Sequence, residues 1–255
     1  MESQRETGRT IRSVQIAFSI IDTLQRKNGA GVTEIANELG HSKSTVHSHL
    51  GTLEELEIVV REDGQYRLSL QILGMAQHVR EQVGNYEVIR SEVETLAADT
   101  GEIAQFGIEE HNRVSYLCKA AGDSAVETAS SVGTQQPIYS TSLGKTICAY
   151  LPRERVEEIV AETEFVAQTR NTITTPEEFF EDLEAIRDRG YGIDDEENIN
   201  GLRCVAAPVR KGEKVLGAIS VSGPSSRFTD ERLHGELSDY VQRAANVIEL
   251  NTKFS

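Results

Sequence analysis

Residues 33–56 read TEIANELGHSKSTVHSHLGTLEEL, and this stretch decides the fold of the first part of the chain. Thr33 predicts the cap of a short helix, and Gly40 is the residue type that suits the left-handed backbone at a helix end. Ser42 predicts the cap of a second helix, which runs to about Leu56. Two short helices joined by a brief turn that contains glycine are typical of a helix-turn-helix.

The flanking residues extend this motif on both sides. Apolar residues from Ile11 to Leu24 recur every three or four positions, which predicts a preceding helix that ends at residues 28–31. Two β-prone runs, 58–61 and 65–68, flank a Glu-Asp-Gly sequence that is typical of a hairpin turn. Three helices followed by a hairpin predict a winged helix-turn-helix domain over residues 1–68.

The polar side of the third helix carries mostly short side chains: Lys43, Ser44, Thr45, His47 and Ser48. Small hydroxyls near a helix N-terminus suit close approach to phosphates and base edges. Arg61 and Arg67 lie on the wing strands, where they are placed to meet phosphates. We therefore predict that these seven residues bind DNA. A solvated helix with ordinary caps, or a winged helix used for protein contacts, are the alternatives.

The charge distribution agrees with a DNA-binding first segment. The 255 residues include 26 Lys and Arg against 41 Asp and Glu, for a net charge of −15. Residues 1–80 contribute only −1 of this and residues 81–255 contribute −14. A segment that approaches a polyanion is expected to be spared such negative charge, although chance can produce the same asymmetry in a short segment.

The composition indicates a globular protein of a salt-rich cytoplasm. Only seven of the basic residues are Lys, and a carboxylate-rich surface is tolerated where salt screens its self-repulsion, although an ordinary acidic protein is the alternative. The absence of a long apolar run or an apolar leader disfavours membrane spanning and secretion. Three widely spaced cysteines favour a reducing compartment over disulfides, and no metal or cofactor is expected.

The remainder of the chain predicts a linker helix over 69–84 and an α+β domain over 85–255. Its expected helices cover about 88–100, 143–150, 152–161, 176–189 and 230–250. Its expected strands cover 103–108, 114–119, 202–209 and 215–221. Antiparallel strands that alternate irregularly with helices indicate a sheet covered by helices on one side.

Three catalytic signals in this domain each fail. Residues 141–146 end like a phosphate-binding loop, but Tyr139 stands where its first glycine is required. Cys204 lies in an apolar strand with no His nearby in the sequence. The four acids at 194–197 are interpreted as a solvated loop rather than a cation site. We therefore expect no enzyme, with catalysis by Cys204 as the less favoured alternative.

A binding pocket is better supported than catalysis. Ser142 predicts a helix cap that leaves the backbone amides of Leu143, Gly144 and Lys145 free for a carboxylate or hydroxyl. Two residues of a later strand, Ser220 and Ser222, share one face of it, and hydroxyls buried there are costly unless they are partnered. A polar ligand would satisfy them, as would water.

Both halves resemble IclR-type transcriptional regulators. In the first half the resemblance rests on residues 13–18, 22–24, 34–36, 43–47 and 64–68. In the second it rests on 142–145, 189–191 with Asp194, 201–208 and 218–224. The resemblance implies a GAF-like effector-binding domain whose pocket includes Ser142, Leu143, Asp194, Leu202, Cys204, Ser220 and Ser222. One departure is Ser48, which replaces the Arg usual after the Tyr or His of the third helix; Arg is the commonest strong reader of guanine, so the operator is expected to differ.

The resemblance also implies how the protein works. Such regulators are dimers or tetramers that bind a pseudo-palindromic operator and respond to a small organic acid, sugar acid or sugar, and the pathway expected here is sugar or pentose catabolism. A dimer would place two recognition helices about 34–36 Å apart in successive major grooves. Effector binding would shift this spacing through the linker helix. A redox sensor built on Cys118, Cys148 and Cys204 is the rival hypothesis.

Overall fold

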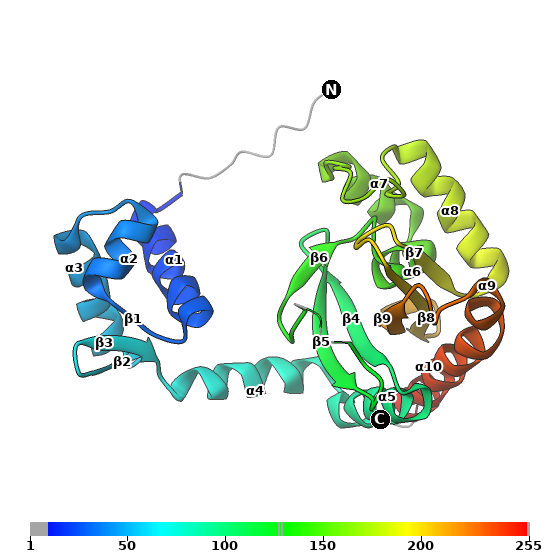
Figure 1. Ribbon diagram of the computed structural model, residues 1–255, viewed down its shortest axis with the longest axis horizontal. Helices are drawn as coiled ribbons and strands as arrows, with labels where there is room; N and C mark the ends of the chain where they lie inside the picture. The colour runs from blue at the N-terminus through cyan, green and yellow to red at the C-terminus, as the bar shows by residue number, and fades with distance from the viewer. Residues whose placement is uncertain (1–9, 127, 129, 254–255) are drawn as a thin grey trace. The chain divides into compact units, whose positions relative to one another are not determined.

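The computed structural model describes residues 10–126, 128 and 130–253 of the chain (Figure 1). The chain divides into two compact units, residues 1–82 and 83–255. The first unit contains the predicted winged helix. Its elements are α1 (Arg12–Lys27), β1 (Ala30–Gly31), α2 (Val32–Leu39), α3 (Lys43–Glu55), β2 (Val59–Glu62), β3 (Gln65–Leu68) and α4 (Gln71–Val83).

Most of the predicted helix signals in the first unit are confirmed. The Ser42 hydroxyl accepts a hydrogen bond from the Thr45 backbone N–H at 3.1 Å, which caps α3. Gly40 ends α2 with a φ of 66°. At the wing turn Asp63 and Gly64 have φ values of 50° and 80°, as a two-residue hairpin with the right-handed strand twist requires.

The predicted cap at Thr33 is wrong. Helix α2 already begins at Val32, with Gly31 in the cap position and no side-chain cap hydrogen bond. The reason is β1, whose residues the sequence interpretation assigned only to the end of the preceding helix. Its residues Ala30 and Gly31 pair with β3, so that the sheet has the order β1-β3-β2 and sets the point at which the helix starts.

The second unit is built on a six-stranded antiparallel sheet of order β6-β5-β4-β9-β8-β7. The strands are β4 (Ile103–Glu110), β5 (Arg113–Ala121), β6 (Gln135–Pro137), β7 (Gly192–Asp195), β8 (Leu202–Lys211) and β9 (Lys214–Pro224). The helices are α5 (Tyr86–Thr100), α6 (Ser142–Tyr150), α7 (Arg153–Glu162), α8 (Pro176–Arg189), α9 (Asp230–Arg232), the π-helical turn η1 (Leu233–Leu237) and α10 (Ser238–Lys253). The two edge strands, β6 and β7, were not predicted.

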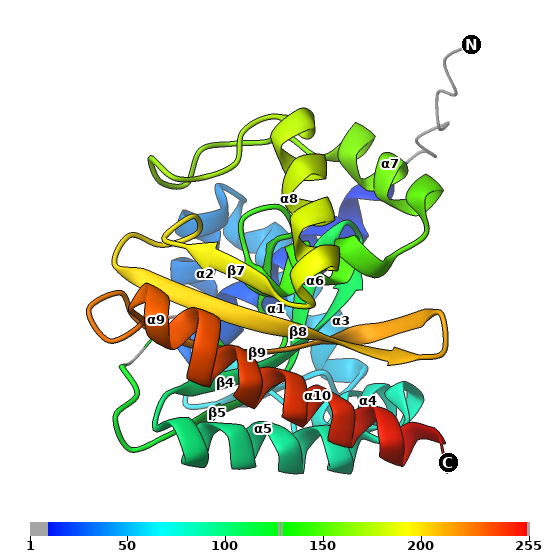
Figure 2. The ribbon, with the colours of Figure 1, turned by 90° about the vertical axis from the view of Figure 1, so that its right-hand side faces the viewer.

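Helices cover both faces of this sheet, which corrects the expectation of one (Figure 2). Helices α5 and α10 bury residues such as Val93 and Val241 against Phe106 and Val221. On the other face, α6, α7 and α8 form a second core together with strand residues such as Ala206 and Ala218. The central strands β8 and β9 are therefore apolar on both faces over much of their length, and such strands read as near-continuous apolar runs.

The predicted helix over 230–250 is interrupted. A short α9 leads into the π-helical turn η1 before α10 begins. Across this turn Leu233, Leu237 and Val241 all remain buried. The spacing of the apolar residues therefore found the buried stripe, but it could not distinguish a π turn from a regular one.

Candidate functional site

The candidate DNA-reading surface is the exposed side of α3. Its predicted residues Lys43, Ser44, His47 and Ser48 are exposed, and Thr45 is half-buried. The hydroxyl of Thr45 lies 2.8 Å from that of Ser42, as does the hydroxyl of Ser44. The helix N-terminus therefore presents a hydroxyl cluster, which suits contact with phosphates.

Two further residues of α3, His49 and Gly51, follow these side chains in the sequence. The Nδ1 atom of His49 is 2.8 Å from the Thr45 carbonyl oxygen, so this ring is turned back onto its own helix. Gly51 lies inside the helix, and a Cβ added there would have no atom within 4 Å. Because glycine weakens a helix interior, this position is not explained by packing within the domain.

The two wing arginines are already engaged by neighbouring residues. Arg67 donates to the Glu62 carboxylate, with Nη2 to Oε1 at 2.7 Å, and this pair lowers the pKa of Glu62. The Arg61 guanidinium lies 5.6 Å from the centroid of the Tyr66 ring. The Glu62 carboxylate therefore occupies part of the Arg67 guanidinium and places a negative charge beside it.

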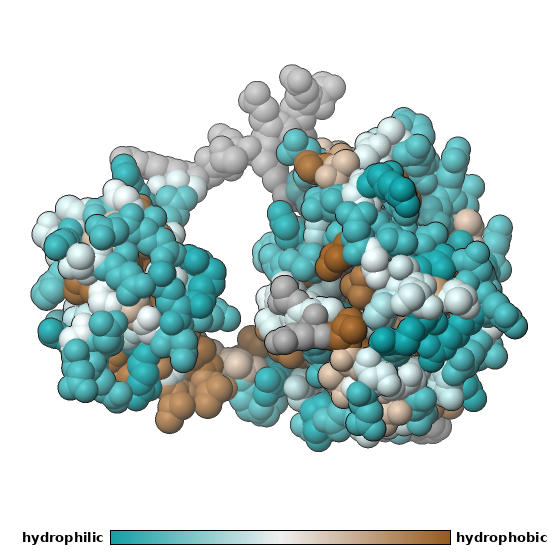
Figure 3. Space-filling model, viewed as in Figure 1, coloured by the Kyte–Doolittle hydropathy of each residue, from teal (hydrophilic) through white to brown (hydrophobic). Residues whose placement is uncertain are grey.

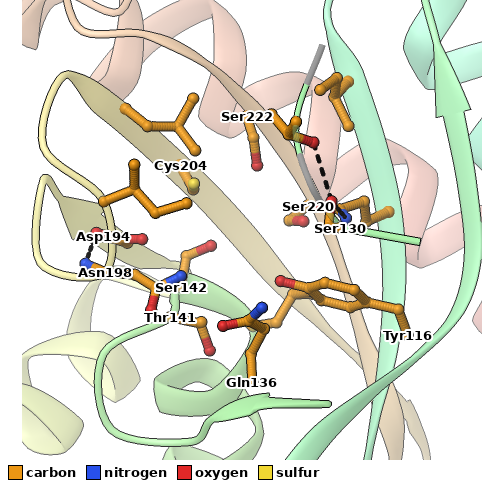
Figure 4. A pocket seen from close by; sticks show the side chains of 16 residues that line it. Tyr116, Ser130, Gln136, Thr141, Ser142, Asp194, Asn198, Cys204, Ser220 and Ser222 are labelled. Atoms are coloured by element: carbon orange, nitrogen blue, oxygen red, sulfur yellow. Dashed lines mark hydrogen bonds between the residues drawn. The ribbon is translucent and has the colours of Figure 1, made fainter. Parts of the chain in front are cut away.

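The second unit contains a partly open cavity of about 70 Å³, shown in Figure 4. The structure brings together all seven residues predicted for the effector site, since each of them lines this cavity. The remaining lining residues are Ile103, Gln105, Tyr116, Thr128, Ser130, Gln136, Thr141, Asn198 and Ile199. One buried water needs about 10–15 Å³ by this measure, so the cavity as it stands holds a ligand of only about half a dozen heavy atoms.

The sheet register explains why these residues meet. Asp194 of β7 is paired with Cys204 of β8, Cys204 with Ser222 of β9, and Ser222 with Ile103 of β4. Residues in register across a sheet point to the same side. One row of four side chains from four strands thus forms the floor of the cavity.

The next row on the same face supplies the rest of the floor. Ala206, Ser220 and Gln105 are in register across β8, β9 and β4. Ser220 and Gln105 of this row line the cavity, whereas Ala206 is fully buried in the core that it shares with α6. The amide of Gln105 donates to the Ser130 hydroxyl at 3.0 Å, which adds a polar wall.

The cap of α6 lies one residue earlier than predicted. Thr141, not Ser142, occupies the cap position, and its hydroxyl accepts the Gly144 backbone N–H at 3.1 Å. The Lys145 amide is also engaged, since it donates to the Thr141 carbonyl oxygen. Of the three backbone amides predicted to be free, only that of Leu143 has no hydrogen-bond acceptor among the described residues. The amide of Ser142, which was not in the prediction, is free as well.

This one-residue shift has a consequence for the cavity. The Ser142 side chain is no longer needed as a cap, and it converges on the cavity with Ser220 (Figure 4). Both serines are nearly fully buried, at 2% and 1% exposure. Within the described part of the chain neither hydroxyl has a hydrogen-bond partner. Neither oxygen is among the fully buried atoms that lack a partner, so both face the open space of the cavity and are available to hydrogen-bond a polar occupant or water.

Asp194 is the charged residue of the cavity wall, and it is not part of a solvated loop as predicted. Its side chain is 2% exposed, and Oδ1 accepts the backbone N–H groups of Glu197 at 2.7 Å and Asn198 at 3.3 Å. Burial, reinforced by the charge of Glu197, raises the pKa of Asp194 to about 7. Glu197 is itself buried, whereas Asp195 between them is exposed.

A buried lysine holds this loop in place. The Lys145 ammonium lies 2.5 Å from the Glu197 carboxylate and 2.8 Å from that of Asp182 on α8. Burial opposes the charge of Lys145, but the two carboxylates outweigh that effect, and the pKa of Lys145 is raised. The pair joins α6 and α8 to the segment that carries Asp194, Asn198 and Ile199. Lys145 is therefore a positioning residue for one wall of the cavity.

Sequence reasoning missed several lining residues for which it had signals. Gln105 is a polar residue inside an otherwise apolar strand, and Lys145 is the one charged residue of α6. A single polar or charged residue within an otherwise apolar strand or helix could have indicated a buried polar site. Tyr116 and Asn198 gave no such signal, because only the register of the sheet and the Lys145 contact bring them to the cavity.

The three cysteines are buried and unbonded to one another. Burial raises the pKa of the Cys148 thiol, and burial together with Asp194 raises that of Cys204. A thiol held protonated is a poor nucleophile and a poor oxidation target. Among the described residues no group of His, Cys, Asp and Glu is placed to hold a metal ion. These features speak against both the redox sensor and catalysis by Cys204.

Comparisons with known proteins agree with this architecture. The family model described as "IclR helix-turn-helix domain" matches residues 13–63, and "Bacterial transcriptional regulator IclR C-terminal" matches residues 78–250. The chain therefore belongs to the IclR family of DNA-binding transcriptional regulators, with an effector domain in its C-terminal part. This membership places it among regulators rather than enzymes.

Three relatives illustrate the likeness. The probable HTH-type transcriptional regulator ArcR of Halobacterium salinarum is 34% identical, over 95% of this chain and 94% of that protein. The crystal structure of the Thermotoga maritima IclR has a TM-score of 0.80 at 28% identity, covering 95% of this chain and 99% of that one. An IclR homologue from Microbacterium hydrocarbonoxydans, complexed with 4-hydroxybenzoate, has a TM-score of 0.80 at 21% identity, covering 95% and 100%.

None of the described helices is both long enough and apolar enough to cross a lipid bilayer.

Proposed function

We propose that this regulator senses a small carboxylate metabolite in the cavity of its second unit and thereby controls a carbohydrate or organic-acid catabolic operon. The observation that carries this proposal is the pair of buried, unpartnered hydroxyls of Ser142 and Ser220 beside the free Leu143 amide. Backbone amides at a helix N-terminus favour anions. The bound 4-hydroxybenzoate of the Microbacterium homologue is itself a carboxylate.

We further propose that DNA is read by Lys43, Ser44, Thr45, His47 and Ser48, with Arg61 and Arg67 on phosphates. The exposure of these α3 residues supports the assignment. The near-neutral charge of residues 1–80 supports it as well. The absence of an Arg after His47 means that hydrogen bonds from short side chains and the His47 ring discriminate the bases.

The regulator is proposed to act as a homodimer on a pseudo-palindromic site, either alone or within a tetramer. An apolar groove of about 570 Å³ runs between α1, α3 and α4 within the first unit, lined by residues such as Phe18, Leu56 and Met75. Those three side chains are more than half exposed. In Figure 3 hydrophobic side chains gather at the start of α4. Exposed apolar patches of this kind mark protein interfaces.

The composition supports a salt-rich cytoplasm as the place of action, and the relative from Halobacterium salinarum agrees with it. In high salt the release of counterions contributes little affinity. Base contacts and dimer avidity are then expected to dominate. Specific binding that persists in molar potassium chloride would support this account, and a steep loss would count against it.

The experiment that tests the proposal is genome-wide occupancy of the tagged protein in its own host, grown on several carbon sources. Sharp sites upstream of a catabolic operon that change with one carbon source are the expected result. The promoter fragments so found then serve for binding assays with candidate carboxylates. Flat occupancy on every carbon source, with the protein expressed, would refute the proposed function.

A further inference from the structure

An ionised Asp194 would repel the carboxylate ligand that is proposed to bind in the same cavity. None of the sixteen lining residues, all within the described chain, is Lys, Arg or His, and Asp194 is a carboxylate in the same small space. An anion bound at the Leu143 amide therefore shares a cavity of about 70 Å³ with a second negative group. Like charges this close in a poorly hydrated site cannot both remain ionised at low cost.

Two cations lie near the cavity, and neither solves this problem. The Lys119 ammonium donates to the hydroxyls of the lining residues Thr128 and Ser130 at 3.0 and 3.2 Å and to their carbonyl oxygens, and it is not among the main charges that shift the pKa of Asp194. Lys145 is fully buried and already pairs with Glu197 and Asp182, so the three together carry an excess negative charge. Arg189 Nη2 lies 3.5 Å from Asp182 Oδ1, the carboxylate oxygen that Lys145 does not contact. Lys145 does favour the ionised form of Asp194, but burial and the charge of Glu197 prevail over it.

The other groups that face Asp194 are not charged at neutral pH. The Cys204 thiol on β8 lies within hydrogen-bonding reach of the carboxyl, and burial raises its pKa well above the usual value. Burial also raises the pKa of the Tyr116 phenol on β5. Among the groups that line the cavity, Asp194 is thus the one that can change its charge near neutral pH, because its pKa is about 7. Burial also raises the pKa of Glu197, but that carboxyl lies outside the cavity lining and pairs with Lys145.

We infer that the protein binds its anionic effector together with one proton, which resides on the Asp194 carboxyl group and converts it from a repelling anion into a hydrogen-bond donor. The inference rests on the proposed function, since it assumes a carboxylate ligand in this cavity. The occupancy of the cavity then depends on both the effector concentration and the proton concentration. A falling cytoplasmic pH therefore strengthens the response to the same concentration of the metabolite.

The size of the effect follows from the fraction of protein that is competent to bind. The apparent dissociation constant is the intrinsic one divided by the protonated fraction of Asp194. With a pKa of about 7, the affinity for an anion weakens about tenfold from pH 6 to pH 8. Close to one proton is taken up per ligand at pH 8 and close to none at pH 6.

The experiment is isothermal titration of the full-length protein with pyruvate and lactate, each of six heavy atoms, and with the neutral amide of lactate. It is run at pH 6, 7 and 8, in two buffers of different ionisation enthalpy at each pH, so that proton uptake is measured directly. The variant Asp194→Asn keeps a neutral group at the site, and it is expected to bind the acids with the same affinity at every pH and without proton uptake. Asp195→Asn is the matched control, because Asp195 is the exposed neighbour and pairs with Arg203 instead; it should keep the tenfold pH dependence.

Three outcomes would overturn the inference. Affinity of the wild type for the acids that stays constant or rises from pH 6 to pH 8 would show that Asp194 is ionised in the complex and accepts a ligand hydroxyl. Loss of binding in Asp194→Asn would lead to the same conclusion. Binding of the amide but of none of the acids would show that the ligand is not an anion. Because the titrations contain no DNA, these failures are distinct from flat genomic occupancy, which would refute the regulatory function itself.

Discussion

Replacing Lys145 by Met tests the most demanding energetic claim of the structure, that a buried cation holds the cavity wall. Methionine has a similar length and leaves the packing of α6 nearly intact, but it removes the charge that faces Glu197 and Asp182. Removing one partner of a buried ion pair typically costs about 3–5 kcal/mol, because an uncompensated charge remains buried. For a domain of this size that loss lowers the melting temperature by roughly 6–20 °C.

The destabilisation of Lys145→Met should depend on pH. Burial already raises the pKa of Glu197, and Lys145 is the group that opposes this rise. Without Lys145 the folded-state pKa of Glu197 rises further above its unfolded value, so the folded variant binds protons that the unfolded chain has released. Its stability deficit relative to the wild type is therefore full at pH 8 and shrinks as the pH falls towards 5.

Thermal and urea unfolding followed by circular dichroism measure both effects. The triple variant Lys145→Met, Asp182→Asn, Glu197→Gln removes the buried charges together and should recover most of the lost stability. Lys211→Met, at an exposed residue of β8, is the matched control and should change stability by less than about 0.5 kcal/mol. A loss below about 1 kcal/mol in Lys145→Met, or a triple variant as unstable as the single one, would refute the reasoning.

Three further predictions concern the two units separately. Ser44→Ala combined with Thr45→Ala should weaken DNA binding at least tenfold, about 1.4 kcal/mol, while ligand titrations stay unchanged; loss of both activities would indicate misfolding instead. Gly51→Ala should stabilise the first unit by about 0.5–1 kcal/mol and yet weaken operator binding, because the new methyl group lies on a helix surface with no internal neighbour; unchanged affinity would show that this side of α3 does not face DNA. In urea unfolding at pH 5 and pH 7, the wild type should lose stability relative to Asp194→Asn as the pH rises, by at most about 1.4 kcal/mol per pH unit, because the folded carboxyl retains its proton up to about pH 7. Equal pH slopes would contradict that assignment.

The winged helix was predictable because each of its signals is local. Ser42 caps α3 through an amide three residues away, and Gly40 ends α2 by its own backbone conformation. Where a distant strand intervenes, local reasoning failed. Thr33 has the chemistry of a cap, but pairing between β1 and β3 starts the helix before it.

The seven predicted residues that line the cavity were chosen largely by resemblance, and the chemistry of the cavity was not predicted. The predicted Ser142 cap and the predicted solvated loop at 194–197 were both wrong. Neighbouring Thr and Ser residues can both cap a helix, and the sequence does not show which of them does so. It also does not show which acidic residue a buried lysine will pair with. A shift of one residue at Thr141 leaves the Ser142 hydroxyl without a partner in the cavity. The buried pairing of Lys145 with Glu197 turns two of four consecutive acids inward.

The sequence by itself determined the two-part organisation, the helix-turn-helix with its exposed hydroxyls, the charge asymmetry and most helices and strands, because these depend on residues within a few positions of one another. Tertiary structure alone decided which helices cover which face of the sheet, and that Asp194, Cys204, Ser222 and Ile103 form one row. Those contacts join residues that are up to 119 positions apart in the chain, as with Ile103 and Ser222. Their proximity, and with it the shifted pKa of Asp194, arises only when the strands are paired in register and water is excluded from the space above them.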